Sequence, residues 1–381
     1  MTFTMTDNVT GTKLERVEFH AHTKMSGFDS VIDVGELIET ALKMGHRAVA
    51  ITDHGCVYAL PEAKHILERL ARKPEYKEAT EEFKIIYGCE GYLVNDDNLI
   101  DENGNPVSSE TEYVSEIKNR AYTHVTLLCR NETGRKNLYR LVSESYVKYF
   151  GKGRPRMPKS LLNKYRDGLL LGSACDMGEL FKALLQGKSR EVIERIAGFY
   201  DYLEIQPVEN YAGSYITNEA YPEIKTKEDL WKLNIVITEI AEKQSKLCIA
   251  ASDAHFIEPA DERYRKIARY ISAVRRNNVE NYKETDDALF FRTTDQMVQS
   301  LKEHMDEEKA FTIAVTNTIK ISDMIEYISP VGDDGFHPEL LSYDKALEYV
   351  KDYCTYKNIQ LSEEETDQAA EKLSGMRIHL G

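Results

Sequence analysis

The stretch Val17–His22, VEFHAH, ends a short apolar run on two histidines that are one residue apart. Residues two apart on an extended strand share a face, with roughly 6–7 Å between their Cα atoms, so the imidazoles of His20 and His22 can reach one cation. Two histidines near a strand end are as often plain surface side chains. The stretch alone therefore leaves a metal site and a solvated surface as equal alternatives.

The composition is that of an ordinary globular protein. The chain has 381 residues, of which 42% are hydrophobic and 30% are charged, so it can bury a large core and disorder is not expected over most of its length. The first residues lack a basic stretch followed by an apolar core, and no segment approaches the roughly 18 apolar residues of a membrane span. We therefore expect a cytoplasmic protein.

Charge and cysteine content argue against further classes. A net charge of −15 disfavours a broad, sequence-independent grip on duplex DNA, which depends on Lys and Arg neutralising phosphates. It leaves room for a local basic rim around a site. The six cysteines show no CxxC spacing, which disfavours structural disulfides and a zinc ribbon. Any cysteine with a role is expected to act singly.

Short β-branched runs alternate with amphipathic segments along the chain, which is the pattern of repeated βα units. A helix is predicted after the first strand, with Asp33 as its N-cap, Glu36 three residues later and Gly45 at its end. Seven strands suit a closed or nearly closed α/β barrel better than a sandwich. The candidate strands are Arg16–His20, Arg47–Thr52, Lys84–Gly88, Thr123–Leu128, Gly168–Gly172, Asp201–Gln206 and Leu247–Ser252.

Two segments interrupt this alternation. Residues 95–119 are polar and rich in turn formers, so they are expected to form an exposed excursion between strands. After Pro330 a loop leads into two charged helical patterns, Tyr343–Thr355 and Ser362–Ser374. The predicted organisation is an N-terminal tail over residues 1–15, a barrel over 16–330 and a small helical appendage over 331–381.

Functional residues of parallel βα architectures come from the loops after the strands, because those loops open on one face. Histidines, carboxylates and one cysteine gather at these positions, and chance rarely collects so many at one end. They are His20, His22, Asp29, Asp53, His54, Glu90, Cys175, Asp253 and His255, together with His124 at the start of the fourth strand. The other histidines, which are expected to be structural or solvated, are His46, His65, His304, His337 and His379.

Imidazoles, carboxylates and a single thiolate suit zinc, manganese or iron, whereas calcium and magnesium prefer oxygen ligands alone. The set exceeds what one ion can bind, so more than one ion is indicated. A multi-metal cluster with bridging carboxylates commonly activates a water and holds phosphoryl oxygens during in-line displacement. The pattern therefore predicts phosphate-ester hydrolysis, with Asp253 or Glu90 as the bridging carboxylate. Asp53 is expected to support His54 without binding metal itself.

The set EFHAHT, AITDHG, YGCE, HVTLL, GSAC and SDAH resembles the PHP (polymerase and histidinol phosphatase) superfamily. Longer strings, among them ETGRKNLYRLVSESYVKYF and GLLLGSACDMGELF, resemble the PHP portion of PolC-type DNA polymerase III alpha subunits. The likeness covers roughly residues 16–330. It implies a distorted (β/α)7 barrel and a centre of three divalent transition-metal ions (zinc, manganese or iron), with Asp253, Glu90 and His22 as catalytic residues. The implied metal ligands are His20, His22, Asp29, His54, Glu90, His124, Cys175, Asp253 and His255.

The chain also departs from the PolC pattern. PolC-type subunits carry an exonuclease inserted within this module, and here the corresponding place holds only the polar excursion at 95–119. The chain ends where the polymerase palm would begin, so DNA polymerase activity is not expected from it. No ligand position is substituted, which favours a working centre over a vestigial one.

A basic segment, VKYFGKGRPRMPKS at residues 147–160, precedes the strand that carries Cys175. Its Lys152, Arg154 and Arg156 can grip phosphates of a nucleic-acid end, with Tyr149 or Phe150 stacking on a base; a solvated basic loop is an equal alternative. The resemblance to polymerase modules favours a 3′ end of single-stranded DNA, hence 3′–5′ exonuclease action. Two other functions stay open: a small phosphomonoesterase of histidinol-phosphatase type, and a non-catalytic module that docks on replication proteins.

Overall fold

The computed structural model describes residues 15–97, 99–100, 106–107, 109–216, 218–282, 284–285, 287–332 and 341–374. The chain divides into two compact units, Met1–Pro330 and Val331–Gly381, and each is described by itself. Most of the predicted N-terminal tail, part of the excursion at 95–119, and the histidines at 337 and 379 lie outside the described residues.

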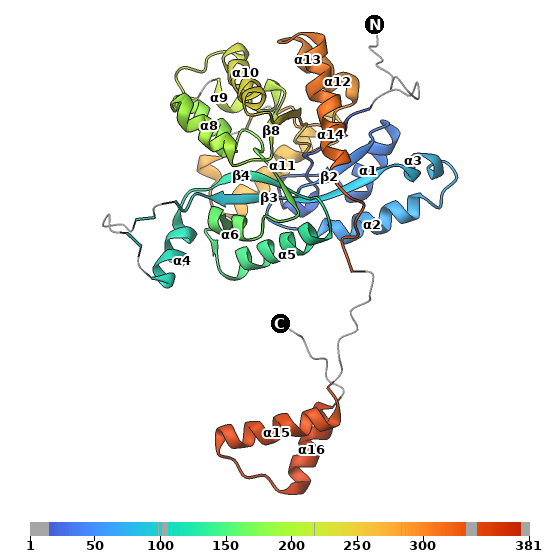
Figure 1. The fold of residues 1–381 in the computed structure, drawn as a ribbon, viewed down its shortest axis with the longest axis vertical. Coiled ribbons are helices and arrows are strands. Elements are labelled where there is room, and N and C mark those ends of the chain that lie inside the picture. Colours follow the sequence, from blue (N-terminus) through green and yellow to red (C-terminus); the bar gives the residue numbers. More distant parts are fainter. Residues whose placement is uncertain are drawn as a thin grey trace. The chain divides into compact units, whose positions relative to one another are not determined.

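The larger unit is built on one curled sheet with helices around it (Figure 1). The main path of the sheet runs β1-β2-β3-β4-β7-β8-β9, and these seven strands coincide with the seven predicted ones. The strands are β1 (Val17–Glu18), β2 (Ala48–Ile51), β3 (Lys84–Val94), β4 (Thr123–Cys129), β5 (Phe150–Gly151), β6 (Arg154–Pro158), β7 (Leu169–Gly172), β8 (Tyr202–Ile205) and β9 (Leu247–Ala250).

The two ends of this strand path meet. The amide of His22 donates to the carbonyl of Ala254 at 2.8 Å, and the amide of Ala254 donates to the carbonyl of His20 at 3.0 Å. Earlier in the same segments, the Glu18 carboxylate accepts from the Ser252 amide at 3.1 Å. The sheet therefore closes on itself, and the predicted distorted seven-stranded α/β barrel is confirmed.

Amphipathic helices cover the sheet. α1 begins at the predicted N-cap, since the Asp33 side chain accepts from the amide of Gly35, and Leu37 and Ile38 of its apolar face are fully buried. The helices of this unit are α1 (Val34–Lys43), α2 (Ala59–Leu70), α3 (Lys77–Glu81), α4 (Glu110–Asn119), α5 (Glu132–Val147), α6 (Lys159–Lys164), α7 (Glu179–Leu185), α8 (Arg190–Gly198), α9 (Ala212–Tyr215), α10 (Lys227–Lys243), α11 (Glu262–Arg275), α12 (Thr294–Lys302), α13 (Glu307–Phe311) and α14 (Asn317–Asp323).

The expectation of a uniform parallel βα repeat is wrong at one strand. β4 runs antiparallel to both β3 and β7, whereas the pairs β1–β2, β2–β3, β7–β8 and β8–β9 are parallel. A reversed strand presents its first residues where parallel strands present their last. For this reason His124, near the start of β4, reaches the same mouth of the barrel as residues that follow the other strands.

Two segments expected to be loops contain regular structure. The excursion at 95–119 ends in helix α4, whose first turn is capped by the Ser109 side chain. The basic segment forms the hairpin β5–β6, and β6 pairs in parallel with β3. Lys152 and Gly153 both have positive φ angles, 48° and 76°, as a two-residue type I′ hairpin turn requires. The segment has few β-branched residues, so its composition does not indicate strands.

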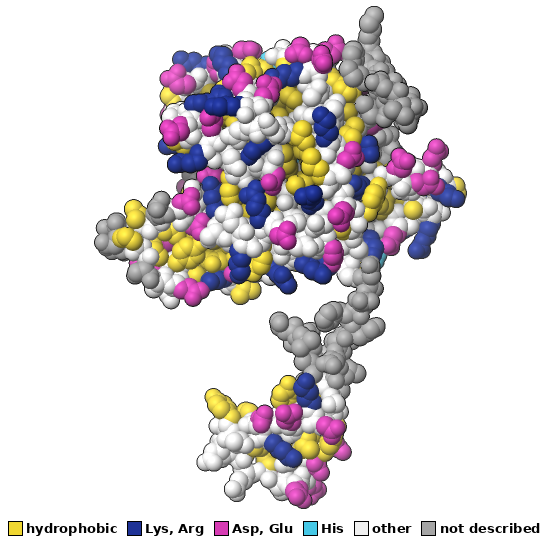
Figure 2. All heavy atoms as spheres, in the orientation of Figure 1, with side chains coloured by type: hydrophobic (Ala, Val, Ile, Leu, Met, Phe, Trp, Pro, Cys, Tyr) yellow, Lys and Arg dark blue, Asp and Glu magenta, His cyan; other side chains and the backbone are white. Residues whose placement is uncertain are grey.

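The smaller unit is a pair of helices, α15 (Tyr343–Lys357) and α16 (Glu363–Leu373). Leu341, Ala346 and Ala370 form its small apolar core, and its bounds follow the two helical patterns in the sequence. No described helix of either unit has the length and apolar content needed to cross a membrane. On the face shown in Figure 2, acidic and basic side chains are intermixed and do not gather by sign.

The contact between Gly134 in α5 and the turn before β7 provides a test of the fold. A Cβ on Gly134 would lie 1.8 Å from the carbonyl oxygen of Gly168, so Gly134→Ala must push the helix away from that turn. We expect a loss of about 3 kcal/mol in the free energy of unfolding, measured by urea denaturation. Gly198→Ala is the control, because a Cβ there meets nothing within 4 Å. Equal stability of the two variants would contradict this packing.

Candidate metal centre

All nine predicted metal ligands lie at one mouth of the barrel. His20 and His22 follow β1, His54 follows β2, and Asp253 and His255 follow β9. The remaining four are Asp29 in the loop after β1, Glu90 within β3, His124 in β4 and Cys175 after β7. Parallel and antiparallel strands thus deliver side chains from four loops and two strands to one place.

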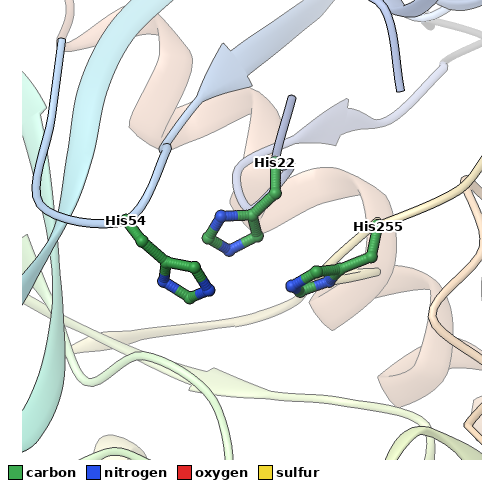
Figure 3. A group of neighbouring side chains, drawn as sticks. All are labelled: His22, His54 and His255. Atoms are coloured by element: carbon green, nitrogen blue, oxygen red, sulfur yellow. The ribbon is translucent and has the colours of Figure 1, made fainter. Parts of the chain in front are cut away.

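Three overlapping groups of these side chains have donor atoms within 4.8 Å of one another: His22–His54–His255, His20–His22–Asp253 and His54–Glu90–His124. The imidazoles of His22, His54 and His255 approach one another from three separate segments (Figure 3). The ring centroids of His22 lie 4.2 Å from those of His54 and 4.4 Å from those of His255. Such crowding of imidazoles suits a shared cation.

Three of the histidines are held through Nδ1. That atom of His20 contacts the Glu204 carboxylate at 2.8 Å, and that of His255 contacts the carbonyl of Asp253 at 2.7 Å. The carbonyl oxygen can only accept, as can the Glu204 oxygen when that carboxylate is ionised, so each Nδ1 then carries the proton. His22 Nδ1 contacts the hydroxyl of Ser26, which itself donates to Asp53. In all three rings Nε2 is therefore the atom with a free lone pair when the ring is neutral.

Asp53 acts differently from its predicted role. Its carboxylate accepts from the amide and hydroxyl of Thr23 and from the hydroxyl of Ser26. The support therefore passes through Ser26 to His22, while Ser26 also accepts from the backbone amide of His54 at 3.2 Å. Asp53 holds the first loop in place and does not contact the His54 ring by any described hydrogen bond.

The donor atoms at the mouth fit metal ions by a direct criterion. Buried polar atoms normally have a hydrogen-bond partner, and five buried atoms of the candidate ligands have none with hydrogen-bond geometry, although two of them, His54 Nδ1 and Glu90 Oε2, lie 2.6 Å apart. The five are Nε2 of His20, Nε2 of His22, Nδ1 of His54, Oε2 of Glu90 and Oδ1 of Asp253. Burying these nitrogen and oxygen atoms without hydrogen bonds would cost free energy in a purely structural polar cluster. Bound cations would satisfy the same atoms as ligands.

The spacing of the Asp253 oxygen and the Nε2 atoms of His20 and His22 agrees with this, whereas Glu90 lies closer to its neighbours. Ligand atoms around a tetrahedral zinc ion, at 2.0–2.3 Å from it, are roughly 3.3–3.8 Å apart. Asp253 Oδ1 lies 3.4 Å from His20 Nε2 and 3.3 Å from His22 Nε2. Glu90 is central, with Oε1 at 3.2 Å from His20 Nε2 and 2.9 Å from His124 Nδ1, and Oε2 at 2.6 Å from His54 Nδ1.

Burial and mutual charge set the protonation of the cluster. Burial lowers the pKa of His22, and His54 and His255 lower it further, so this ring is neutral and able to bind a cation. Burial raises the pKa of Glu90, but the charges of His124, His20 and His54 outweigh it and hold the net pKa well below the usual range. Ionised carboxylates among imidazoles form a site where cations can replace protons.

Asp29 and Cys175 complete the cluster from opposite sides. Asp29 Oδ2 lies 3.1 Å from His54 Nε2 and 3.7 Å from His255 Nε2. Burial raises the pKa of Asp29, but Arg265, whose guanidinium contacts Oδ1 at 2.7 Å, together with His255 and His54 outweighs it and brings the pKa well below the usual value. Cys175 Sγ lies 3.5 Å from Glu90 Oε1 and 3.7 Å from His124 Nδ1, so a thiolate there would share their cation.

The three predicted substrate-binding residues are dispersed. Arg154 lines the pocket at the mouth, which has a volume of about 270 Å³, with its guanidinium over the ring of Tyr92. Arg156 is buried and donates to the carbonyls of Arg120 and Gly151. Lys152 is exposed and donates to the carbonyl of Asn119, outside the residues that line the pocket.

Several residues that shape this site escape the sequence analysis. Glu204 lies in the middle of β8, where a buried glutamate is itself a signal, since charged residues are almost never fully buried without a partner. Arg265 and Arg269 lie on α11 and line the pocket with Tyr92 and Tyr122. Their spacing on a helix carries no signal that one face turns toward the barrel mouth.

Comparison with known proteins agrees with this geometry. Residues 18–208 match the family model described as PHP domain. The chain is 39% identical over 227 residues to a DNA polymerase III PolC-type protein of Clostridium perfringens, and 42% identical over 230 residues to that of Bacillus subtilis; each match covers about 60% of this chain. A third, from Oceanobacillus iheyensis, is 35% identical over 311 residues and covers 79% of this chain. These matches span only 15% to 20% of the relatives' own length.

Among solved structures, an amidohydrolase from Chromobacterium violaceum with bound sulfate aligns with 63% of this chain and 87% of its own, at 13% identity. The TM-score is 0.32, and a similarity this weak carries no inference about the site.

The Glu204 contact predicts a change in metal affinity. Glu204→Ala removes the acceptor that orients His20, and partners of this kind typically contribute 10–100-fold to affinity, so we expect zinc or manganese to bind about 10–100-fold more weakly by calorimetric titration. Glu204→Gln keeps an acceptor oxygen and should lose less.

Glu179→Ala is the matched control for this titration. It removes a partly buried carboxylate, paired with Lys159 at 2.7 Å, that has no described contact with the histidines. Unchanged affinity in Glu204→Ala, or an equal loss in the control, would refute a specific role for Glu204.

Proposed function

Because the chain belongs to the PHP domain family, we propose that its barrel mouth binds three divalent transition-metal ions and hydrolyses phosphate esters, acting as a 3′–5′ exonuclease on DNA ends. The observation that carries the proposal is the set of five buried imidazole and carboxylate atoms that crowd together at one mouth without hydrogen-bond geometry. A fold alone would not demand unpartnered imidazole and carboxylate atoms there.

The nine ligands divide naturally among three ions. His20, His22 and Asp253 would hold one ion, and His124 with Cys175 would hold a second. Asp29, His54 and His255 would hold the third. Glu90 would bridge, because its two oxygens face different histidines, with Oε1 toward His20 and His124 and Oε2 toward His54.

Divalent ions in such a site supply Lewis acidity and an activated water for in-line displacement at phosphorus. The residues of the chain keep the ions close together and orient them. Glu90 and Asp253 each lie among several imidazoles, and the His22 ring stays neutral because burial and its neighbours lower its pKa. We therefore assign Asp253, Glu90 and His22 as the residues on which catalysis depends most directly.

Arg154 is the residue that we assign to the substrate phosphate. It lines the same pocket as Glu90, His124 and Asp253, and none of the ion pairs in the described part of the chain involves it. Stacking on Tyr92 holds the guanidinium without consuming its charge. Tyr122, beside it in the pocket lining, offers an aromatic face for a nucleobase.

The pocket favours a chain end over an internal phosphate. Its volume of about 270 Å³ suits one nucleotide unit and not a duplex. The relatives from Clostridium perfringens and Bacillus subtilis are named as DNA polymerases, which supports DNA as the polymer. A DNA-end substrate would set the protein in the cytoplasm, near replication proteins.

Asp253→Asn tests the catalytic assignment. Loss of one carboxylate between His20 and His22 should abolish metal-dependent hydrolysis, with at least a roughly 1,000-fold fall in kcat/KM, about 4 kcal/mol of transition-state stabilisation. The assay uses 5′-labelled single-stranded DNA and bis-p-nitrophenyl phosphate with manganese or zinc, and circular dichroism checks the fold. Hydrolysis at the parent rate would refute the assignment.

Arg154→Ala tests the substrate assignment. Loss of one charged contact to phosphate should raise KM for the DNA oligonucleotide about 10–100-fold, the equivalent of 1.5–3 kcal/mol, with metal content unchanged. Arg69→Ala, an exposed arginine on α2, is the control. An unchanged KM would remove Arg154 from the substrate site.

The same assays separate the alternatives. Hydrolysis of small phosphomonoesters without DNA degradation would indicate a histidinol-phosphatase-like enzyme and refute the exonuclease. Full metal content without turnover on any substrate would indicate a non-catalytic module that associates with replication proteins.

A further inference from the structure

Helix α11 turns a charged side toward the protein and exposes its apolar side to solvent. The only fully buried side chain on it is that of Arg265, while five large apolar side chains lie on the exposed face. Their exposed fractions are 48% for Tyr264, 57% for Ile267, 48% for Tyr270, 41% for Ile271 and 50% for Val274. An apolar stripe at helical spacing normally packs on the core, and this one faces away from it.

The charges on the inward side explain this orientation. Arg265 contacts Asp29 at 2.7 Å and Asp287 at 2.8 Å, and Arg269 contacts Asp287 at 3.1 Å. These contacts turn the charged side of α11 toward the pocket and leave the apolar side outside. The arginines secure the helix at the barrel mouth, but they cannot bury its hydrophobic face.

We propose that this face pairs with the same face of a second copy of the chain, in an antiparallel arrangement. Tyr264, Ile267, Ile271 and Val274 follow the 3-4-3 spacing of a helix–helix seam. The seam is symmetric about its centre, so reversing one copy sets Ile267 against Ile271 and Tyr264 against Val274. A two-fold pair requires such self-complementarity, and a seam for an unrelated partner does not.

The charges at the ends of α11 agree with this pairing. The exposed Glu258 and the half-buried Asp261 and Glu262 lie at its beginning, beside one exposed arginine, Arg263. The exposed Arg275 and Arg276 lie at its end. Antiparallel pairing brings the acidic end of one copy to the basic end of the other. Phe28, which is 41% exposed and lies under the Arg275 guanidinium, would extend the apolar contact beyond the helix.

A nucleic acid is a poorer occupant of this surface despite the arginines. Arg265 and Arg269 are paired with carboxylates, and Lys266 lies 3.3 Å from Glu262. The positive charge of these three side chains is therefore largely neutralised, and the aliphatic side chains of Ile267, Ile271 and Val274 make no favourable contact with a polyanion. The pairing does not depend on the proposed hydrolytic function.

Sedimentation equilibrium of the full chain tests the pairing. We expect the mass to rise from 43.7 kDa toward twice that value over about a hundredfold range of concentration, since one short helix pair is small for an interface. The double variant Ile267→Glu, Val274→Glu should stay monomeric throughout. Val147→Glu, at a side chain on α5 that is 87% exposed, should dimerise as the parent does.

Arg276 tests the antiparallel register. Arg276→Glu sets like charges at the paired ends and should weaken the dimer at least about tenfold, while Arg276→Lys should preserve it. A parent chain that stays monomeric, or a dimer unaffected by the double variant, would overturn the proposal. If the parent chain is monomeric and binds oligo-dT or anionic lipid vesicles, and the double variant loses that binding, the surface belongs to that ligand. This outcome would also overturn the proposed pairing.

Discussion

The site depends on the closure of the sheet between the segments that follow β1 and β9. Ala21 and Ala254 form a parallel bridge. Because successive side chains on a strand point to opposite faces, the residues on either side of each alanine point to the face opposite to the alanine side chain. His20 and His22 on one segment therefore lie on the same side as Asp253 and His255 on the other. Without this closure the first and last ligands, more than 230 residues apart in sequence, would have no common space.

Closure at this point has its own buried polar support. Arg16 and Glu18 are fully buried and paired at 2.7 Å, and the Arg16 guanidinium also donates to the carbonyl of Ala250 at 2.8 Å. Glu18 accepts from the amides of His20 and Ser252. A buried ion pair contributes little net stability, but breaking it is costly. Here it joins β1 to the end of β9 and fixes the register in which the proposed metal ligands meet.

The sequence predicts most of this arrangement, because each parallel strand ends at the mouth and local patterns locate the strands. All seven strands and the cap at Asp33 follow from hydrophobic period and capping chemistry. The reversal of β4 does not, since strand direction is set by pairing with distant residues and leaves no local mark. Glu204 and Arg265 likewise depend on long-range contacts. The spacing of the apolar residues in α11 would predict a buried face, yet this face is exposed. Helical periodicity does not show that the arginines on the opposite face pair with carboxylates and set the orientation of the helix.

Two residues at the barrel mouth have backbone conformations that cost free energy. Asp253 and Ala174 have φ angles of 51° and 58°, in the left-handed region that costs most residues roughly 1–2 kcal/mol. Asp is among the few residue types that tolerate this region, so the residue at position 253 suits the backbone conformation and also supplies a negative charge. Ala174 is not one of these residue types, so its backbone conformation is strained. Its strain is held by the tight turn at Cys175–Gly178, where the amide of Gly178 donates to the carbonyl of Cys175 and that of His124 to Met177. The strained turn sets the Cys175 sulfur against His124 and Glu90, where it would contribute to the proposed metal centre.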